Sequence, residues 1–132
     1  MKIFISHAMA DNELVSEFAA QLRNEGFEVF SPDRDVLPGE NLARRVADAI
    51  ERADAMVVIG SEDAGKSHSV LWEVNFALGS PKYKNRLITV LMDKDAEIPW
   101  ILNRLPVIHL NKKTRGEVGR LVAERLREVA TA

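Results

Sequence analysis

One carboxylate in this sequence lies among large apolar side chains in a pattern that could do chemistry. Glu73 belongs to a stretch whose apolar residues recur at helical spacing, namely Val70, Leu71, Val74, Ala77 and Leu78. A helical wheel places Glu73 at the edge of that stripe, with Trp72 and Phe76 beyond it. A carboxylate held there, partly removed from water in a cleft, is typical of a functional acid. The alternative is an ordinary glutamate at the edge of a helix.

A second pattern matches a phosphate-binding loop. Gly60 and Gly65-Lys66-Ser67 fit G-x-x-x-x-G-K-[ST] between a predicted strand and a predicted helix, and Leu87 to Asp93 resembles a Walker B strand. However, Glu62 and Asp63 would place two negative charges where such a loop surrounds phosphate groups. Only two predicted strands follow the motif. These features favour a chance match over an ATPase or GTPase, and predict a surface loop here.

The three histidines do not indicate a metal centre. His7, His68 and His109 lack the spacing of metal ligands, and no cluster of Asp or Glu completes a site, so we expect no bound metal. His7 lies in the loop after the first apolar run, where its ring could contact a substrate. We expect His68 at the start of a helix and His109 in the last strand.

Five short apolar runs predict the strands that position these residues. Each is bounded by polar or turn residues: Ile3 to Ile5, Phe27 to Phe30, Met56 to Ile59, Leu87 to Met92, and Val107 to Leu110. Between the runs the apolar spacing is helical, as in Leu14, Phe18 and Leu22, in Leu42, Val46 and Ile50, and in Val118, Val122 and Val129.

The helix boundaries follow from capping residues. Asp11 is a plausible N-cap of the first helix, and Gly26 a plausible stop. The helix that carries Glu73 should run from Ser67 to Leu78, where Gly79, Ser80 and Pro81 end it. A short helix is expected near Ile98 to Leu105.

Alternating strands and helices predict an α/β fold with a doubly wound, all-parallel sheet covered by helices on both faces. Five units suggest the flavodoxin-like strand order 2-1-3-4-5, in which ligands bind beyond the carboxyl ends of strands one and three. These ends lead into Ser6 to Asp11 and into Gly60 to Ser67. The second segment begins the helix of Glu73.

Composition narrows the classes of function. The chain has 132 residues, of which 46% are hydrophobic, and this suits one domain over residues 1–132. A net charge of −2 argues against nucleic acid and against an anionic membrane as partners. Because the chain lacks cysteine and any apolar run long enough to span a membrane, we expect a cytoplasmic location.

Three short motifs, in this order, resemble those of bacterial TIR (Toll/interleukin-1 receptor) domains. Phe4-Ile5-Ser6-His7-Ala8 with Asp11 resembles their opening box. Arg34 to Gly39 resembles the family's BB loop, and the stretch from Ser67 through Glu73 to Leu78 resembles its catalytic helix. The resemblance covers essentially the whole chain, and it implies the same flavodoxin-like fold.

The resemblance also implies an activity: cleavage of NAD between nicotinamide and ribose, with Glu73 as the catalytic residue. NAD is then the substrate, and no cofactor is expected. Ser6, His7, Asp33 and Arg34 match positions in the loops that border the family's NAD pocket.

The sequence departs from the family at one position of the catalytic helix. Where many members carry tryptophan four residues before the glutamate, this chain has Ser69, and its aromatic residue is Trp72. We count both residues among those that bind the substrate. Trp72, Phe76 or Phe30 could stack on a ring of NAD, although aromatic residues at such spacings more often pack against the protein.

A single carboxylate suffices for this reaction. Nicotinamide is cationic in NAD and leaves as a neutral molecule, so no general acid has to protonate it. The remaining requirement is an anion that stabilises the oxocarbenium-like ribose and accepts hydrogen bonds from its hydroxyl groups. Glu73 would do both without a metal.

Two functions from different classes remain open. One is an NAD nucleosidase that releases nicotinamide and ADP-ribose or a cyclic ADP-ribose-type signal, which the family would place in bacterial antiviral defence. The other is a non-catalytic interaction module that signals by homotypic association. The resemblance implies NAD and a second copy of the chain as partners, and a downstream effector that binds the product. An exposed patch of Trp72 and Phe76 would suit the self-association.

Overall fold

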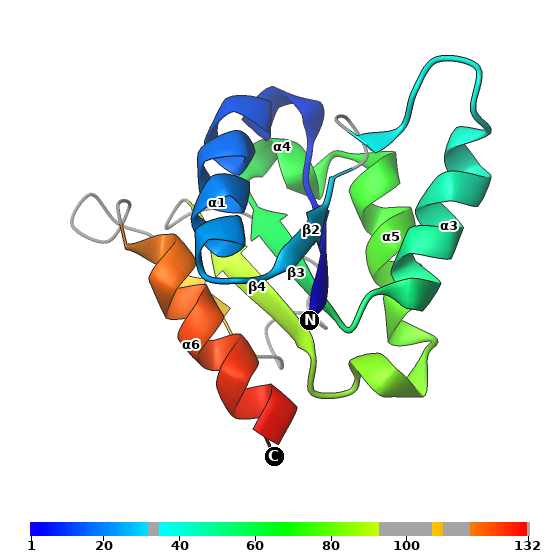
Figure 1. Ribbon diagram of the computed structural model, residues 1–132. Helices are drawn as coiled ribbons and strands as arrows, with labels where there is room; N and C mark the ends of the chain where they lie inside the picture. Colours follow the sequence, from blue (N-terminus) through cyan, green and yellow to red (C-terminus); the bar gives the residue numbers. More distant parts are fainter. Residues whose placement is uncertain (32–34, 93–106, 110–116, 132) are drawn as a thin grey trace.

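The computed structural model describes residues 1–31, 35–92, 107–109 and 117–131. For residues 129–131 it describes the backbone alone. The predicted helix near Ile98 to Leu105 lies outside this part of the chain, as do Asp33, Arg34 and the side chain of Val129. Figure 1 shows three layers, with a central sheet between two layers of helices.

The sheet has the predicted order and direction. Its strands are β1 (Lys2–Ser6), β2 (Glu28–Phe30), β3 (Ala55–Gly60), β4 (Leu87–Leu91) and β5 (Val107–His109). All pair in parallel, in the order β2-β1-β3-β4-β5. The chain changes direction across the sheet between β1 and β3, so the carboxyl ends of these strands form the crevice where parallel sheets bind ligands.

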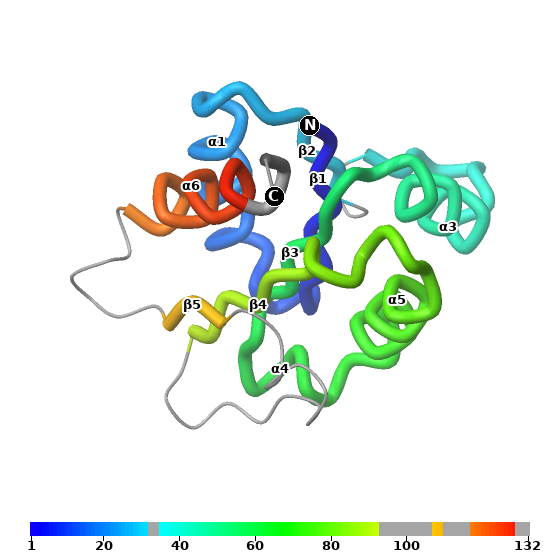
Figure 2. Tube along the Cα trace, turned by 90° about the horizontal axis from the view of Figure 1, so that it is seen from below, coloured from blue at the N-terminus to red at the C-terminus, as the bar shows by residue number. Residues whose placement is uncertain are grey.

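Helices cover both faces of the sheet (Figures 1 and 2). On one face, α1 (Asn12–Asn24) and α6 (Val118–Thr131) pack on the odd-numbered side chains of β1, and on the other, α3 (Leu42–Arg52) and α5 (His68–Leu78) pack on Phe4. The predicted stripes account for this packing, because Phe18 and Leu22 of α1 are buried, as are Val46 and Ile50 of α3.

Two large residues of the predicted apolar stripes, Leu42 and Leu78, are exposed. Leu42 is the first residue of α3 and is 57% exposed, because this end of the helix extends beyond the sheet. Leu78 is the last residue of α5 and is also exposed. The spacing therefore predicted the helices correctly but placed their end residues wrongly.

The predicted helix boundaries hold, with one correction at Asp11. Gly26 follows α1 with a φ of +95°, which glycine adopts without strain, and Ser67 caps α5 by accepting a hydrogen bond from the Val70 amide. Asp11 occupies the N-cap position of α1, but its side chain makes no capping hydrogen bond. That carboxylate instead accepts a hydrogen bond from Ser61.

The segment predicted to be a surface loop before α5 contains a short helix, α4 (Glu62–Gly65). Four residues are too few to show a helical period, although Ser61 followed by two acidic residues is a recognisable N-cap signal. Two 3-10 turns, Met9–Asp11 and Pro81–Tyr83, complete the described elements. None of the described helices is long and apolar enough to cross a membrane.

Candidate active site

Glu73 lies inside the fold, not at the edge of its helix. Its side chain is only 5% exposed, on the face of α5 that also buries Val70, Val74 and Ala77. Ser6, the last residue of β1, donates a hydrogen bond from its hydroxyl to Glu73 Oε1 at 2.7 Å. This bond joins the carboxyl end of β1 to α5, so the carboxylate stands at the crevice of the sheet.

Burial changes the acidity of this carboxylate. Removal from water raises the pKa of Glu73 from 4.5 to about 7, while the hydrogen bond from Ser6 acts in the opposite direction and lowers it. Desolvation dominates because the apolar residues of the core surround most of the side chain. A carboxyl with a pKa near neutrality in a cleft is a candidate for catalysis.

A pocket of about 560 Å³ opens in front of Glu73. Its walls come from the β1–α1 loop, from α3 and from the first half of α5, and its lining residues are His7, Met9, Leu42, Ala43, Val46, Ser67, His68, Ser69, Trp72 and Glu73. The lining is mainly apolar. In such a setting the carboxylate would attract a cationic, planar group more strongly than it would in water.

The structure brings four of the predicted site residues into this lining: Glu73, His7, Ser69 and Trp72. Ser6 lies behind the carboxylate, where it is fully buried. His7 is also buried, and its Nε2 lies 2.7 Å from the side-chain oxygen of Asn12, so that nitrogen carries the proton in this contact. Asp33 and Arg34 lie outside the described residues, so their place near the pocket stays a prediction.

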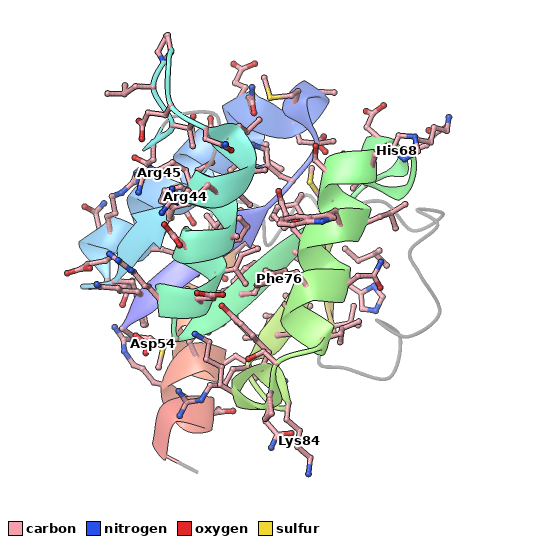
Figure 3. The ribbon with its side chains drawn as sticks, turned by 90° about the vertical axis from the view of Figure 1, so that its right-hand side faces the viewer. Arg44, Arg45, Asp54, His68, Phe76 and Lys84 are labelled. Atoms are coloured by element: carbon pink, nitrogen blue, oxygen red, sulfur yellow. The ribbon has the colours of Figure 1, made fainter. Side chains whose placement is uncertain are left out.

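The aromatic residues have different surroundings. Trp72 is 46% exposed, and its ring lies 5.3 Å from that of Phe76 in a tilted arrangement. Figure 3 views the side on which α3 and α5 lie together, with His68 at the start of α5 and Phe76 further along the helix. Phe30 is stacked on Phe4 at 5.6 Å and is therefore a packing residue. Of the three candidates for stacking on a substrate, only Trp72 faces the pocket.

The segment that matched a phosphate-binding loop makes its backbone hydrogen bonds to acceptors of the same segment. The backbone N–H groups of Ala64, Gly65, Lys66 and Ser67 all donate to acceptors within residues 61–64. Lys66 extends into solvent beside Glu62. A phosphate loop needs free N–H groups that point toward the anion, and this described segment offers none of these four. The structure thus supports the reading of this motif as a chance match.

Sequence reasoning missed several residues of the pocket. Met9, Ala43 and Val46 were not singled out for the site, and Leu42 was assigned to the core. His68 was placed correctly at the start of α5, but it was not assigned to the site. Their signal in the sequence is weak, because an apolar residue at a helix start looks the same whether it enters the core or borders a pocket.

Comparison with known sequences shows the family. The family model described as "TIR domain" matches residues 3–122 of this chain. A relative in Methanobrevibacter olleyae, named "Probable 2' cyclic ADP-D-ribose synthase TcpO", is 41% identical over 66 residues. That match covers 49% of this chain and 19% of the relative, so the chain spans about a fifth of the relative's length.

Comparison with solved structures shows the same fold. The TIR domain of the Toll-related receptor TRR-2 from Hydra magnipapillata superposes with a TM-score of 0.78 at 24% identity, covering 95% of this chain and 97% of that one. A prokaryotic SEFIR domain reaches 0.75 at 15% identity, covering 95% and 91% of the two chains. The CMP N-glycosidase BcmB of Clostridium botulinum reaches 0.65 at 19% identity, covering 92% and 97%.

Proposed function

The chain belongs to the TIR-domain family, and we propose that it cleaves the bond between nicotinamide and ribose in NAD. The observation that carries this proposal is the carboxylate of Glu73, buried at the back of a largely apolar pocket beyond the carboxyl ends of β1 and β3. The name of the Methanobrevibacter relative, a probable cyclic ADP-ribose synthase, supports NAD as the substrate.

The pocket suits the electronic course of this reaction. When the bond between ribose C1′ and the nicotinamide nitrogen breaks, its electron pair neutralises the pyridinium ring, and positive charge appears on the ribose. Ionised Glu73 stabilises that charge, and its oxygens accept hydrogen bonds from the ribose hydroxyl groups. Water then attacks C1′ and loses a proton to give ADP-ribose, or a nucleophile within the same molecule attacks to give a cyclic product.

The remaining lining residues bind and orient NAD. Trp72 offers a flat apolar face at the mouth of the pocket, and the side chains of His7 and Ser69 offer polar groups to the ribose and the phosphates. Asp33 and Arg34 would add a charged loop to the same site. Excluding water around the ring strengthens the attraction between Glu73 and the cationic nicotinamide ring.

Self-association and a role in defence extend this proposal. Leu37, in the loop that resembles the family's BB loop, is 64% exposed. We propose that a second copy of the chain covers this loop and helps to complete the pocket.

The nucleotide product, or the loss of NAD, would then act in bacterial antiviral defence, with a downstream effector that binds the product.

The test is nicotinamide release from NAD at high protein concentration, followed by chromatography with mass analysis of the products. We expect Glu73→Gln to lower the rate by at least about a hundredfold, because it removes the anion from the transition state. Glu13→Gln, which changes an exposed carboxylate on α1, is the matched control and should act like the wild type. The mass of the product distinguishes ADP-ribose from a cyclic nucleotide.

One observation favours a second function, a non-catalytic interaction module. Met9, Leu37 and Leu42 expose large apolar side chains near the mouth of the pocket or on the BB loop, as docking surfaces do. If the concentrated, associated wild-type protein releases no nicotinamide, this module becomes the better description. ATP hydrolysis that is lost in Lys66→Ala would contradict both functions.

A further inference from the structure

We propose that Asp11 and Ser61 form a positioning pair, whose hydrogen bond holds the two walls of the pocket at the separation that catalysis needs. This inference rests on the proposed NAD cleavage, since it assigns a role in that reaction to residues outside the pocket lining. Neither side chain touches the substrate, so both act through the residues that do.

The pair joins two loops at the crevice of the sheet. Ser61 directly follows β3, and its hydroxyl donates to Asp11 Oδ2 at 2.5 Å. Asp11 ends the loop that follows β1, and 50 residues separate the pair in the sequence. Ser61 is only 3% exposed, so water has little access to compete for its hydroxyl. A hydrogen bond to a carboxylate that is shielded from water is among the stronger kinds.

Each side of the bond leads to a different wall of the pocket. Beyond Ser61, the same hydroxyl accepts a hydrogen bond from the Ala64 amide at 3.0 Å, and the Ala64 carbonyl accepts one from the Ser67 amide at 3.1 Å. Ser67 begins α5, which carries Ser69, Trp72 and Glu73. One hydroxyl therefore connects the start of α5 with the loop after β1.

On the other side, the loop after β1 carries His7. The Nε2 of His7 donates a hydrogen bond to the side-chain oxygen of Asn12 at 2.7 Å, and Asn12 follows Asp11 directly. The Asp11 amide also donates to the Ala8 carbonyl at 3.0 Å, which closes the loop into one turn. A displacement of Asp11 would therefore pass to His7 and to Met9 at the pocket.

Asp11 makes this bond in place of a local one. An aspartate at an N-cap normally accepts a hydrogen bond from an amide of the first turn, yet the side chain of Asp11 makes no such bond to α1. A residue that departs from its local preference marks a position constrained by something beyond the stability of its own helix. Here the constraint is the distance between the two walls.

The experiment compares Asp11→Ala with Asp11→Asn, which keeps an acceptor oxygen, and with Asp63→Ala, which removes an exposed carboxylate from α4. For NAD cleavage we expect Asp11→Ala to lower kcat by about tenfold or more, because small misplacements of reacting groups cost that much, while KM changes far less. Asp11→Asn should restore most of the rate, and Asp63→Ala should retain all of it.

A second measurement needs no NAD. Amide hydrogen exchange of residues 7–11 should become faster in Asp11→Ala, whereas Asp11→Asn and Asp63→Ala should keep the wild-type rates. In a protein that already carries Ser61→Ala, the change Asp11→Ala should lower kcat no further, because the bond is already lost.

Three outcomes would contradict the proposal that Asp11 and Ser61 position the walls of the pocket. Wild-type exchange in Asp11→Ala would show that the bond does not hold the loop. Faster exchange with an unchanged kcat would show that it holds the loop without positioning the site. Equal losses in Asp11→Asn and Asp11→Ala would assign the effect to charge. If the wild type releases no nicotinamide, the proposed activity fails, and faster exchange in Asp11→Ala would then assign the hydrogen bond between Asp11 and Ser61 a structural role alone.

Discussion

The buried carboxylate of Glu73 has an energetic consequence for the whole fold. The pKa of Glu73 is about 7 in the folded chain, against 4.5 for an ordinary glutamate in the unfolded chain. The folded protein therefore holds the carboxyl proton more tightly than the unfolded one does. The contribution of Glu73 to stability is then greatest below pH 4.5, falls as pH rises to 7, and stays low above it. A shift of this size corresponds to about 3 kcal/mol. The site is therefore destabilising in the ionised form that catalysis requires.

Replacement of this carboxylate should stabilise the protein while it abolishes activity. In Glu73→Gln the amide oxygen can still accept the hydrogen bond from Ser6, and no ion has to be buried. We expect its free energy of unfolding at pH 8 to exceed that of the wild type by about 3 kcal/mol, and at pH 5 by about 1 kcal/mol or less. Urea unfolding at the two pH values measures this difference. An equal difference at both would show that Glu73 does not titrate as proposed.

The rate of NAD cleavage should follow the ionisation of the same group. We expect kcat/KM to rise about tenfold for each pH unit below 7 and to level off above it, because only the anion stabilises the ribose cation. Ser6→Ala removes the hydrogen bond that lowers the pKa of Glu73, so the midpoint should move to higher pH. Ser16→Ala, on the exposed face of α1, provides the control. A midpoint that stays in place in Ser6→Ala would contradict this assignment.

At the scale of elements, the sequence predicts what depends on repeated local patterns. Five apolar runs locate the strands, and their alternation with helices predicts the sheet order, because parallel crossovers leave few other arrangements. What the pattern does not reveal is where an element stops facing the core. Leu42 continues the stripe of Val46 and Ile50, but it lies at the exposed start of α3. The short α4 leaves no periodic signal at all.

The contact between α1 and α6 depends on a glycine that no pattern indicates. The Gly119 amide donates to the side-chain oxygen of Gln21 at 2.7 Å, and a Cβ atom added at Gly119 would lie 2.3 Å from Gln21 Cβ. Gly119→Ala should therefore push the helices apart and lower the free energy of unfolding by about 1–3 kcal/mol. Gly79→Ala is the control, since its new Cβ would find its nearest neighbour at 3.5 Å. Urea unfolding that gives equal values for both variants would rule out the clash.

For the whole molecule, the site consists of residues that meet only in the folded chain. Ser6 and Glu73 are 67 residues apart, and their motifs could be placed at one crevice from the sheet order alone. Their direct hydrogen bond could not, since it depends on how closely α5 approaches β1. The hydrogen bond between Asp11 and Ser61 could not be predicted from the sequence either, because an aspartate before a helix predicts an N-cap. Tertiary packing decided both contacts.

Association between copies should show in the dependence of activity on protein concentration. If a second copy covers Leu37, specific activity of the wild type rises with concentration as the pocket is completed. Leu37→Ser removes apolar area from the exposed loop, and we expect at least about fivefold lower activity at high concentration with unchanged thermal stability. Leu78→Ser, at the opposite end of α5 from the pocket, is the matched control. Sedimentation velocity on the same samples measures association directly, and identical concentration curves for Leu37→Ser and the wild type would show that this loop is no part of the interface.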